Sequence, residues 1–139
     1  MAPIPDPHPP EVLAVLRRQG PGTRIAVSGA SNDPAKYGNI IVRNLKGKGY
    51  TVLPVNPREE IIEGLPVAHS VGELERPVDI LVVVTPPPVT LRVLREAAEA
   101  GFAAVWLQDG SFDDAVLEFA AAAPFRTVHH ACVMVASNF

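Results

Sequence analysis

One uninterrupted apolar run, Ile80-Leu81-Val82-Val83-Val84, constrains the fold of this chain most strongly. Four of its five residues are β-branched, which favours a strand, and the run contains no polar residue that would suit a face open to water. A strand buried on both faces is typical of the centre of a parallel sheet, which has helices packed on either side. We therefore expect an α/β fold built around residues 79–85.

The segments on either side of this run alternate between strand and helix patterns. Apolar, β-branched runs predict strands over residues 24–27, 50–55, 79–85, 103–107 and 127–129. Apolar residues at helical spacing predict helices over residues 11–19, 37–48, 89–100 and from residue 111 onward. Such alternation pairs strands in parallel through right-handed crossovers. The sequence predicts a doubly wound, mostly parallel five-stranded sheet of the Rossmann type.

Glycines and capping residues mark the expected ends of the helices. A glycine follows each of the first three helices, where left-handed backbone closes a helix: Gly20, Gly49 and Gly101. Ser70 and Glu73 have the spacing of a capping box, which predicts a short helical turn there. Ser111 and Asp114 are expected to cap the last helix.

Length and composition favour one folded domain. The 139 residues suit a single domain, and 47% hydrophobic with 19% charged residues is typical of a globular protein. Residues 1–10 contain five prolines and are expected to form an extended surface tail, which leaves residues 11–139 as the domain.

Charge, cysteine content and hydropathy exclude several classes of function. The net charge of −3 and the lack of a basic run argue against nucleic acid as a partner. One cysteine, Cys132, forms no internal disulfide, and no Cys/His spacing resembles a zinc site. No apolar run approaches the roughly 20 residues of a membrane helix. We expect a cytoplasmic protein with a small-molecule ligand and no metal, and leave a protein partner or homo-oligomer open.

The first ligand loop follows the first strand, because doubly wound sheets bind ligands at the carboxyl ends of their strands. Gly29-Ala30-Ser31-Asn32 forms a small-residue turn before a helix, where free N–H groups and the helix dipole favour phosphate. Only one glycine of the G-x-G-x-x-G fingerprint is present, which weakens the case for NAD. We expect a phosphate cradle, with a plain tight turn as the alternative.

The second ligand loop, Asn56-Pro57-Arg58, has a basic residue where NAD enzymes have an acidic one. An arginine there suits a phosphate on the ribose, either the 2′-phosphate of NADP or the 3′-phosphate of coenzyme A. The alternative is a surface arginine that pairs with Glu59 or Glu60. We predict an adenine nucleotide with a phosphorylated ribose.

The third and fourth loops supply apolar surface. Thr85-Pro86-Pro87 offers a hydroxyl and a rigid rim for an adenine ring or a pantetheine arm, unless it only ends a strand. Trp106 and Gln108 place an indole and an amide at the same edge, with core packing as the alternative for the indole.

A thiol and two imidazoles stand close together near the end of the chain. A neighbouring base activates a cysteine nucleophile, so Cys132 with His129 or His130 suggests an acyltransferase. A buried structural cysteine is the commoner case, and we assign no catalytic residue.

Across residues 23–134 the chain resembles the small bacterial CoA-binding proteins, which share their fold with the nucleotide domain of the succinyl-CoA ligase alpha subunit. The matching stretches are residues 25–32 (IAVSGASN), 49–50 (GY) with 54–57 (PVNP), 78–80 (VDI) and 106–108 (WLQ). The family's usual aspartate, arginine and cysteine near the last strand are replaced here by His129-His130-Ala131-Cys132.

The resemblance implies a role for each loop. Residues 29–32 would hold phosphates, residues 56–58 would approach the phosphorylated ribose, and residues 85–87 and 106–108 would flank the base and the arm. It implies binding of coenzyme A or an acyl-CoA without catalysis, since the ligase's second domain is not part of the match. The rival interpretation is an NADP-dependent oxidoreductase, and a cysteine-based acyltransferase is a third.

Overall fold

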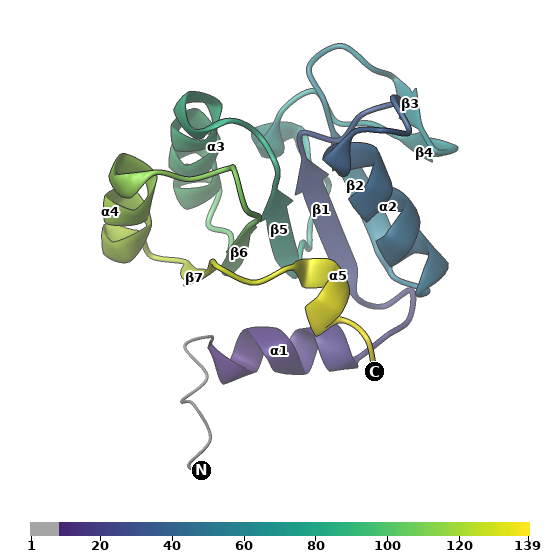
Figure 1. Cartoon of the computed structure of the whole chain (residues 1–139), viewed down its shortest axis with the longest axis horizontal. Coiled ribbons are helices and arrows are strands. Elements are labelled where there is room, and N and C mark those ends of the chain that lie inside the picture. The colour runs from purple at the N-terminus through teal and green to yellow at the C-terminus, as the bar shows by residue number, and fades with distance from the viewer. Residues whose placement is uncertain (1–8) are drawn as a thin grey trace.

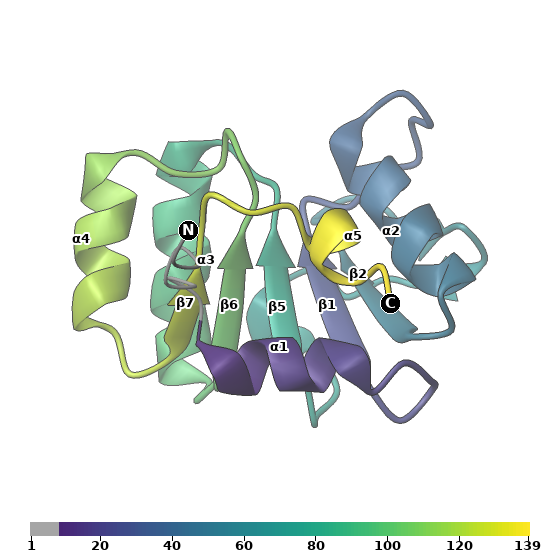
Figure 2. The ribbon, with the colours of Figure 1, turned by 60° about the horizontal axis from the view of Figure 1, so that its bottom comes forward.

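Five parallel strands form the centre of the fold in the computed structural model, which describes residues 9–139. They are β1 (Arg24–Ser28), β2 (Thr51–Val55), β5 (Ile80–Val83), β6 (Ala104–Leu107) and β7 (Arg126–Val128). Their order is β2-β1-β5-β6-β7 with every neighbouring pair parallel, and Figure 2 shows the arrows of β1, β5 and β6 pointing the same way. The strand order reverses between β1 and β5. The predicted doubly wound five-stranded sheet is confirmed.

Helices cover both faces of this sheet (Figures 1 and 2). One face packs against α1 (Pro10–Arg17), α2 (Tyr37–Gly47) and α5 (Val133–Ala136). The other packs against α3 (Pro87–Glu99), α4 (Asp114–Ala122) and a 3₁₀ turn, η1 (Val71–Glu73). All four residues of β5 are fully buried, Ile80 and Val82 toward the first face and Leu81 and Val83 toward the second. The apolar run is therefore buried on both faces, as predicted.

A small antiparallel hairpin follows β2 and was not predicted. It consists of β3 (Ile61–Ile62) and β4 (Leu65–Pro66), joined by Glu63 and Gly64. Both turn residues have positive φ, 49° and 75°, as a two-residue type I′ turn requires. The sequence signal was weak, because the turn has Glu-Gly in place of Asn-Gly and each strand has only two residues.

Two expected caps are wrong. Ser70 makes no side-chain cap, and the Glu73 carboxylate accepts from the His69 N–H at 3.1 Å. The residue that caps α4 is Asp113, whose Oδ1 accepts from the Val116 N–H at 3.0 Å. Ser111 is buried, and its hydroxyl donates to the Gln108 carbonyl at 2.6 Å, so it is not available as a cap.

The predicted N-terminal boundary also shifts. The first helix ends at Arg17, two residues before the expected Gln19. The expected tail includes Pro9 and Pro10, but Pro9 is the N-cap of α1 and Pro10 its first residue, because the first helical position needs no N–H donor. The remaining tail, residues 1–8, lies outside the described residues. Within residues 9–139 the structure has no helix of the length and hydropathy that crossing a bilayer requires.

Candidate functional site

The carboxyl ends of β1, β2 and β5 bring three of the predicted loops together. The Gly29 and Ala30 N–H groups both donate to the Val55 carbonyl at 3.2 Å, which ties the first loop to the end of β2. The Asn56 side chain donates to the Ala30 carbonyl at 2.8 Å. Thr85 lies on the other side, with its backbone nitrogen 3.2 Å from the place that a Cβ on Gly29 would occupy. These loops form one continuous surface, which is the candidate site.

The free N–H groups of the first loop belong to residues further along the chain than expected. Because Gly29 and Ala30 already donate to Val55, they are not free to hold a phosphate. Within the described part of the chain, four N–H groups in and after the loop have no acceptor: those of Ser31, Asn32, Tyr37 and Gly38. The last two belong to the first turn of α2, which has no side-chain cap. Unsatisfied donors at a helix start favour an anion.

Two glycines allow this close packing. Gly29 has φ +94°, and a Cβ there would lie 2.8 Å from Val84 Cγ2. A Cβ on Gly38 would lie 2.0 Å from the Gly29 carbonyl oxygen, so only glycine lets α2 start this close to β1. Sequence reasoning missed Gly38. A glycine that permits close helix–strand packing is part of the dinucleotide fingerprint, but the long first loop moves it outside the usual spacing.

Asn56 shapes the second loop. Its Oδ1 accepts from the N–H groups of Arg58 at 2.8 Å and Glu59 at 3.1 Å, an Asx turn in which the side chain mimics backbone. Its amide nitrogen holds the first loop through Ala30, so Asn56 joins the two loops. Pro57 lies exposed in this turn.

Arg58 is exposed and is not paired with its acidic neighbours. Glu59 Oε2 accepts from Asn32 Nδ2 at 2.8 Å. Glu60 Oε1 lies 2.8 Å from His69 Nε2. Among residues 9–139, the Arg58 guanidinium forms no ion pair. Arg58 is therefore a solvent-exposed arginine, as the alternative has it, but it does not pair with Glu59 or Glu60. It lies in the loop that Asn56 and Glu59 connect to the first loop.

The third loop is short and rigid. Thr85 Oγ1 lies 2.8 Å from Thr90 Oγ1, and the Thr90 hydroxyl also donates to the Thr85 carbonyl at 3.0 Å. Pro86 is the N-cap of α3 and Pro87 its first residue, so this helix begins two residues before the expected position 89. The proline pair thus starts the helix directly at the edge of the site.

Trp106 and Gln108 lie in the interior. Trp106 is 0% exposed, and its indole N–H donates to the Ala131 carbonyl at 2.9 Å. Gln108 is 1% exposed, and its Oε1 accepts from the Val133 N–H at 2.8 Å. Both side chains hold the C-terminal segment against the sheet, so neither is open to a ligand in this structure. Trp106 is therefore packed in the core, which is the alternative that the sequence left open for its indole.

The Cys132 thiol lies beside Tyr37 at the start of α2. Its Sγ is 3.5 Å from the Tyr37 hydroxyl and 3.5 Å from Gln108 Nε2. Burial raises the pKa of the thiol, but hydrogen bonds from Tyr37, Gln108 and the N–H groups of Val135 and Met134 outweigh it, so the pKa lies below its usual value. The hydrogen bond between Tyr37 and Cys132 is also the main reason that the pKa of Tyr37 is raised.

The two histidines pair with each other. His129 Nδ1 lies 2.5 Å from His130 Nδ1, and the Phe112 ring packs against both, with its centroid 4.9 Å from that of His130. The contacts that position the Cys132 thiol come from a phenol and an amide. No group of three or more His, Cys, Asp or Glu side chains within residues 9–139 is arranged to hold a metal ion.

The thiol environment predicts a pH-dependent reactivity. Alkylation of Cys132 by iodoacetamide follows the thiolate, so its rate should rise with pH to a midpoint below that of a free cysteine measured under the same conditions. Tyr37→Phe removes a hydrogen bond that stabilises the thiolate and should move the midpoint upward. The rate is measured by mass spectrometry, with Cys132→Ser as the unlabelled control. A wild-type midpoint at or above the free value, or one that Tyr37→Phe leaves in place, contradicts this account.

Two cavities lie outside the three loops of the candidate site. One of about 490 Å³ runs between α4 and β7 and is lined by residues such as Leu117 and Thr127. Another of about 490 Å³ lies beside α1, against Val12 and Ala104. The loops after β1, β2 and β5 do not line either cavity. The candidate site is therefore marked by its free N–H groups and by Arg58, and neither of these cavities extends into it.

Comparison with known proteins defines the class of this domain. The family model described as a CoA binding domain matches residues 23–138, which include the whole sheet and the candidate site. The chain belongs to this family of CoA-binding domains, and the resemblance seen in the sequence is confirmed.

Individual relatives include both large enzymes and small proteins. The ADP-forming acetate–CoA ligase II alpha subunit of Pyrococcus furiosus is 40% identical over 91 residues, which cover 65% of this chain and 20% of that subunit. The Bacillus subtilis protein YneT is 25% identical over 131 residues, 94% of this chain and 95% of YneT. A conserved hypothetical protein of Pyrococcus furiosus superposes with a TM-score of 0.79 at 47% identity, covering 81% of this chain and 97% of that one. The chain thus spans about a fifth of the ligase subunit but nearly all of the small proteins.

Proposed function

We propose that this protein binds coenzyme A at the carboxyl edge of β1 and β2. The diphosphate meets the free N–H groups of Ser31, Asn32 and the first turn of α2, and the 3′-phosphate meets Arg58. Two observations on adjoining loops carry the proposal. Four N–H groups of the first loop and the start of α2 have no acceptor among residues 9–139. Arg58, which forms no ion pair among those residues, lies in the loop that Asn56 and Glu59 bond to the first loop. Free donors and a cation in adjoining loops suit a ligand with several phosphates. The family match supports coenzyme A as that ligand.

Binding alone is the proposed activity, with acyl-CoA thioesters as further ligands. The ligase relative acts on acetate and CoA, but this chain matches only a fifth of its length. The first three loops supply groups that hold phosphates and a ribose, and we assign no proton donor or nucleophile there. We place the protein in the cytoplasm, where coenzyme A and a free thiol such as Cys132 both remain reduced.

NADP is the competing ligand, because its 2′-phosphate offers Arg58 the same charge. A reductase would also need a substrate pocket and a proton donor beside the nicotinamide. The Thr85 hydroxyl is engaged with that of Thr90, which donates to the Thr85 carbonyl, so neither hydroxyl points to such a donor. We therefore rank NADP below coenzyme A.

Thermal unfolding with added ligand tests the ranking. Coenzyme A at about 100 times its dissociation constant should add roughly 2.7 kcal/mol of stability, which raises the Tm by several degrees. Dephospho-coenzyme A at the same concentration should give a smaller shift, because it lacks the 3′-phosphate. A larger shift with NADP would overturn the assignment of the ligand.

A further inference from the structure

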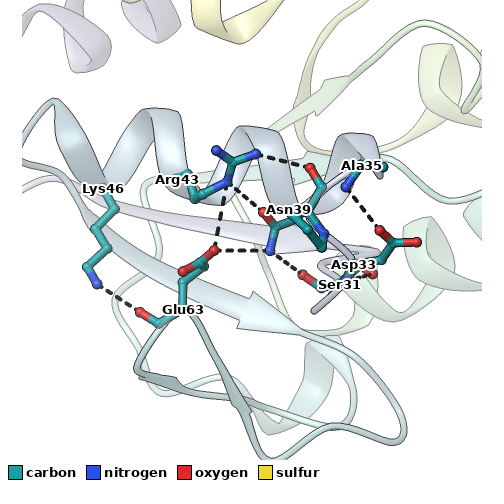
Figure 3. A network of polar contacts seen from close by, with 8 residues as sticks. Ser31, Asp33, Ala35, Asn39, Arg43, Lys46 and Glu63 are labelled. Atoms are coloured by element: carbon teal, nitrogen blue, oxygen red, sulfur yellow. Dashed lines mark hydrogen bonds and ion pairs between the residues drawn. The ribbon is translucent and has the colours of Figure 1, made fainter.

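Asn39 lies buried beneath the first loop with all of its hydrogen-bonding groups engaged (Figure 3). The residue is 1% exposed. Its Nδ2 donates to the Ser31 carbonyl at 2.9 Å and to Glu63 Oε1 at 3.3 Å. Its Oδ1 accepts from Arg43 Nε at 2.6 Å. A buried amide with this set of partners fixes the orientation of each of them.

The bond to Ser31 sets the direction of a neighbouring N–H group. The peptide between Ser31 and Asn32 is trans, so its carbonyl and its N–H point in opposite directions. Because the carbonyl is held by Asn39, the Asn32 N–H points away from Asn39. That N–H is one of the four that have no acceptor among the described residues. We propose that Asn39 is a positioning residue that aims the Asn32 N–H at the phosphates of the ligand.

Arg43 and Glu63 hold the Asn39 side chain in place and connect it to the β3–β4 hairpin. The Arg43 guanidinium donates to the Pro34 carbonyl at 3.1 Å, which holds the far end of the first loop. The Glu63 carboxylate lies 3.8 Å from Arg43 Nε, and its backbone carbonyl accepts from Lys46 Nζ at 2.8 Å. Figure 3 shows α2 joined in this way to the first loop on one side and to the β3–β4 turn on the other. The hairpin thereby stabilises the side chain that orients the loop.

The proposal rests on coenzyme A binding at this loop, and Asn39→Asp tests it. A carboxylate keeps the size of the side chain and still accepts from Arg43, but it cannot donate to the Ser31 carbonyl. The peptide between Ser31 and Asn32 should then turn. Affinity for coenzyme A should fall roughly tenfold or more, because the charge-assisted hydrogen bond from the Asn32 N–H to the phosphate is lost. Dephospho-coenzyme A should lose the same factor, because it keeps the diphosphate. Gly47→Ala in the same helix is the matched control and should bind like wild type, because a Cβ there meets nothing within 4 Å.

A second readout works without ligand. The Asn32 amide resonance in a ¹H–¹⁵N spectrum should move in Asn39→Asp and stay in place in Gly47→Ala. If Asn39→Asp does not fold, Arg43→Ala is used instead, because that side chain is 49% exposed and its loss leaves Asn39 Oδ1 and the Pro34 carbonyl without a donor. It should weaken both ligands by a few-fold.

The experiments distinguish a failure of the proposed role of Asn39 from a failure of the proposed coenzyme A binding. A wild-type protein that binds no coenzyme A contradicts the proposed function, and the Asn32 resonance then still tests the orientation. A folded Asn39→Asp variant that binds both ligands like wild type, or that leaves the Asn32 resonance unmoved, overturns the role of Asn39.

Discussion

Gly38→Ala should lower coenzyme A affinity by more than roughly 100-fold, because a Cβ there lies 2.0 Å from the Gly29 carbonyl oxygen. That oxygen belongs to the backbone, so α2 must move away from the end of β1. The N–H groups of Tyr37 and Gly38 would then leave the phosphate position, and two charge-assisted hydrogen bonds contribute about 3 to 6 kcal/mol. Overpacking should also cost about 1 to 3 kcal/mol of folding stability.

Gly47→Ala in the same helix is the matched control. A Cβ at Gly47 meets nothing within 4 Å, so this change should leave affinity alone and leave stability equal or slightly higher. Urea unfolding and titration calorimetry measure the two quantities for both variants. Wild-type affinity in Gly38→Ala would show that the start of α2 takes no part in binding.

Arg58→Ala should weaken coenzyme A by roughly 10 to 100-fold and leave dephospho-coenzyme A nearly unchanged. A charge-assisted hydrogen bond to the 3′-phosphate contributes about 1.5 to 3 kcal/mol, and the dephospho form has no such group. Because Arg58 is exposed, the preference should also shrink as salt rises.

Calorimetry on wild type and Arg58→Ala with both ligands gives the coupling energy as a double-mutant cycle. A coupling below about 0.5 kcal/mol, the usual scatter for independent sites, would mean that Arg58 does not contact the ribose phosphate. This pattern differs from that of Asn39→Asp, which should affect both ligands equally.

The fold was predictable because its strands are short, apolar and separated by helical patterns. The run at Ile80–Val83 alone placed the centre of the sheet, and Gly49 and Gly101 mark the ends of α2 and α3 with positive φ. The β3–β4 hairpin was missed because two-residue strands carry almost no periodicity. The expected capping pair, Ser111 and Asp114, was wrong because Ser111 is buried and bonds the Gln108 carbonyl, so that Asp113 takes the N-cap position.

The loops of the candidate site were predictable, but the atoms within them were not. The Val55 carbonyl satisfies Gly29 and Ala30, a long-range contact that moves the free donors to Ser31 and Asn32. Trp106 stands at the end of a strand in sequence, but the C-terminal segment folds back and covers it. Neither contact has a local signal in the sequence, because each depends on where a distant segment returns to the sheet.

A calorimetric titration of the wild-type protein with coenzyme A, and with NADP under the same conditions, tests the central claim most directly. We predict saturable binding of one coenzyme A per chain, with an affinity higher than that for NADP and higher than that for dephospho-coenzyme A by roughly 10 to 100-fold. Tighter binding of NADP, or no saturable heat with coenzyme A, would contradict the assignment.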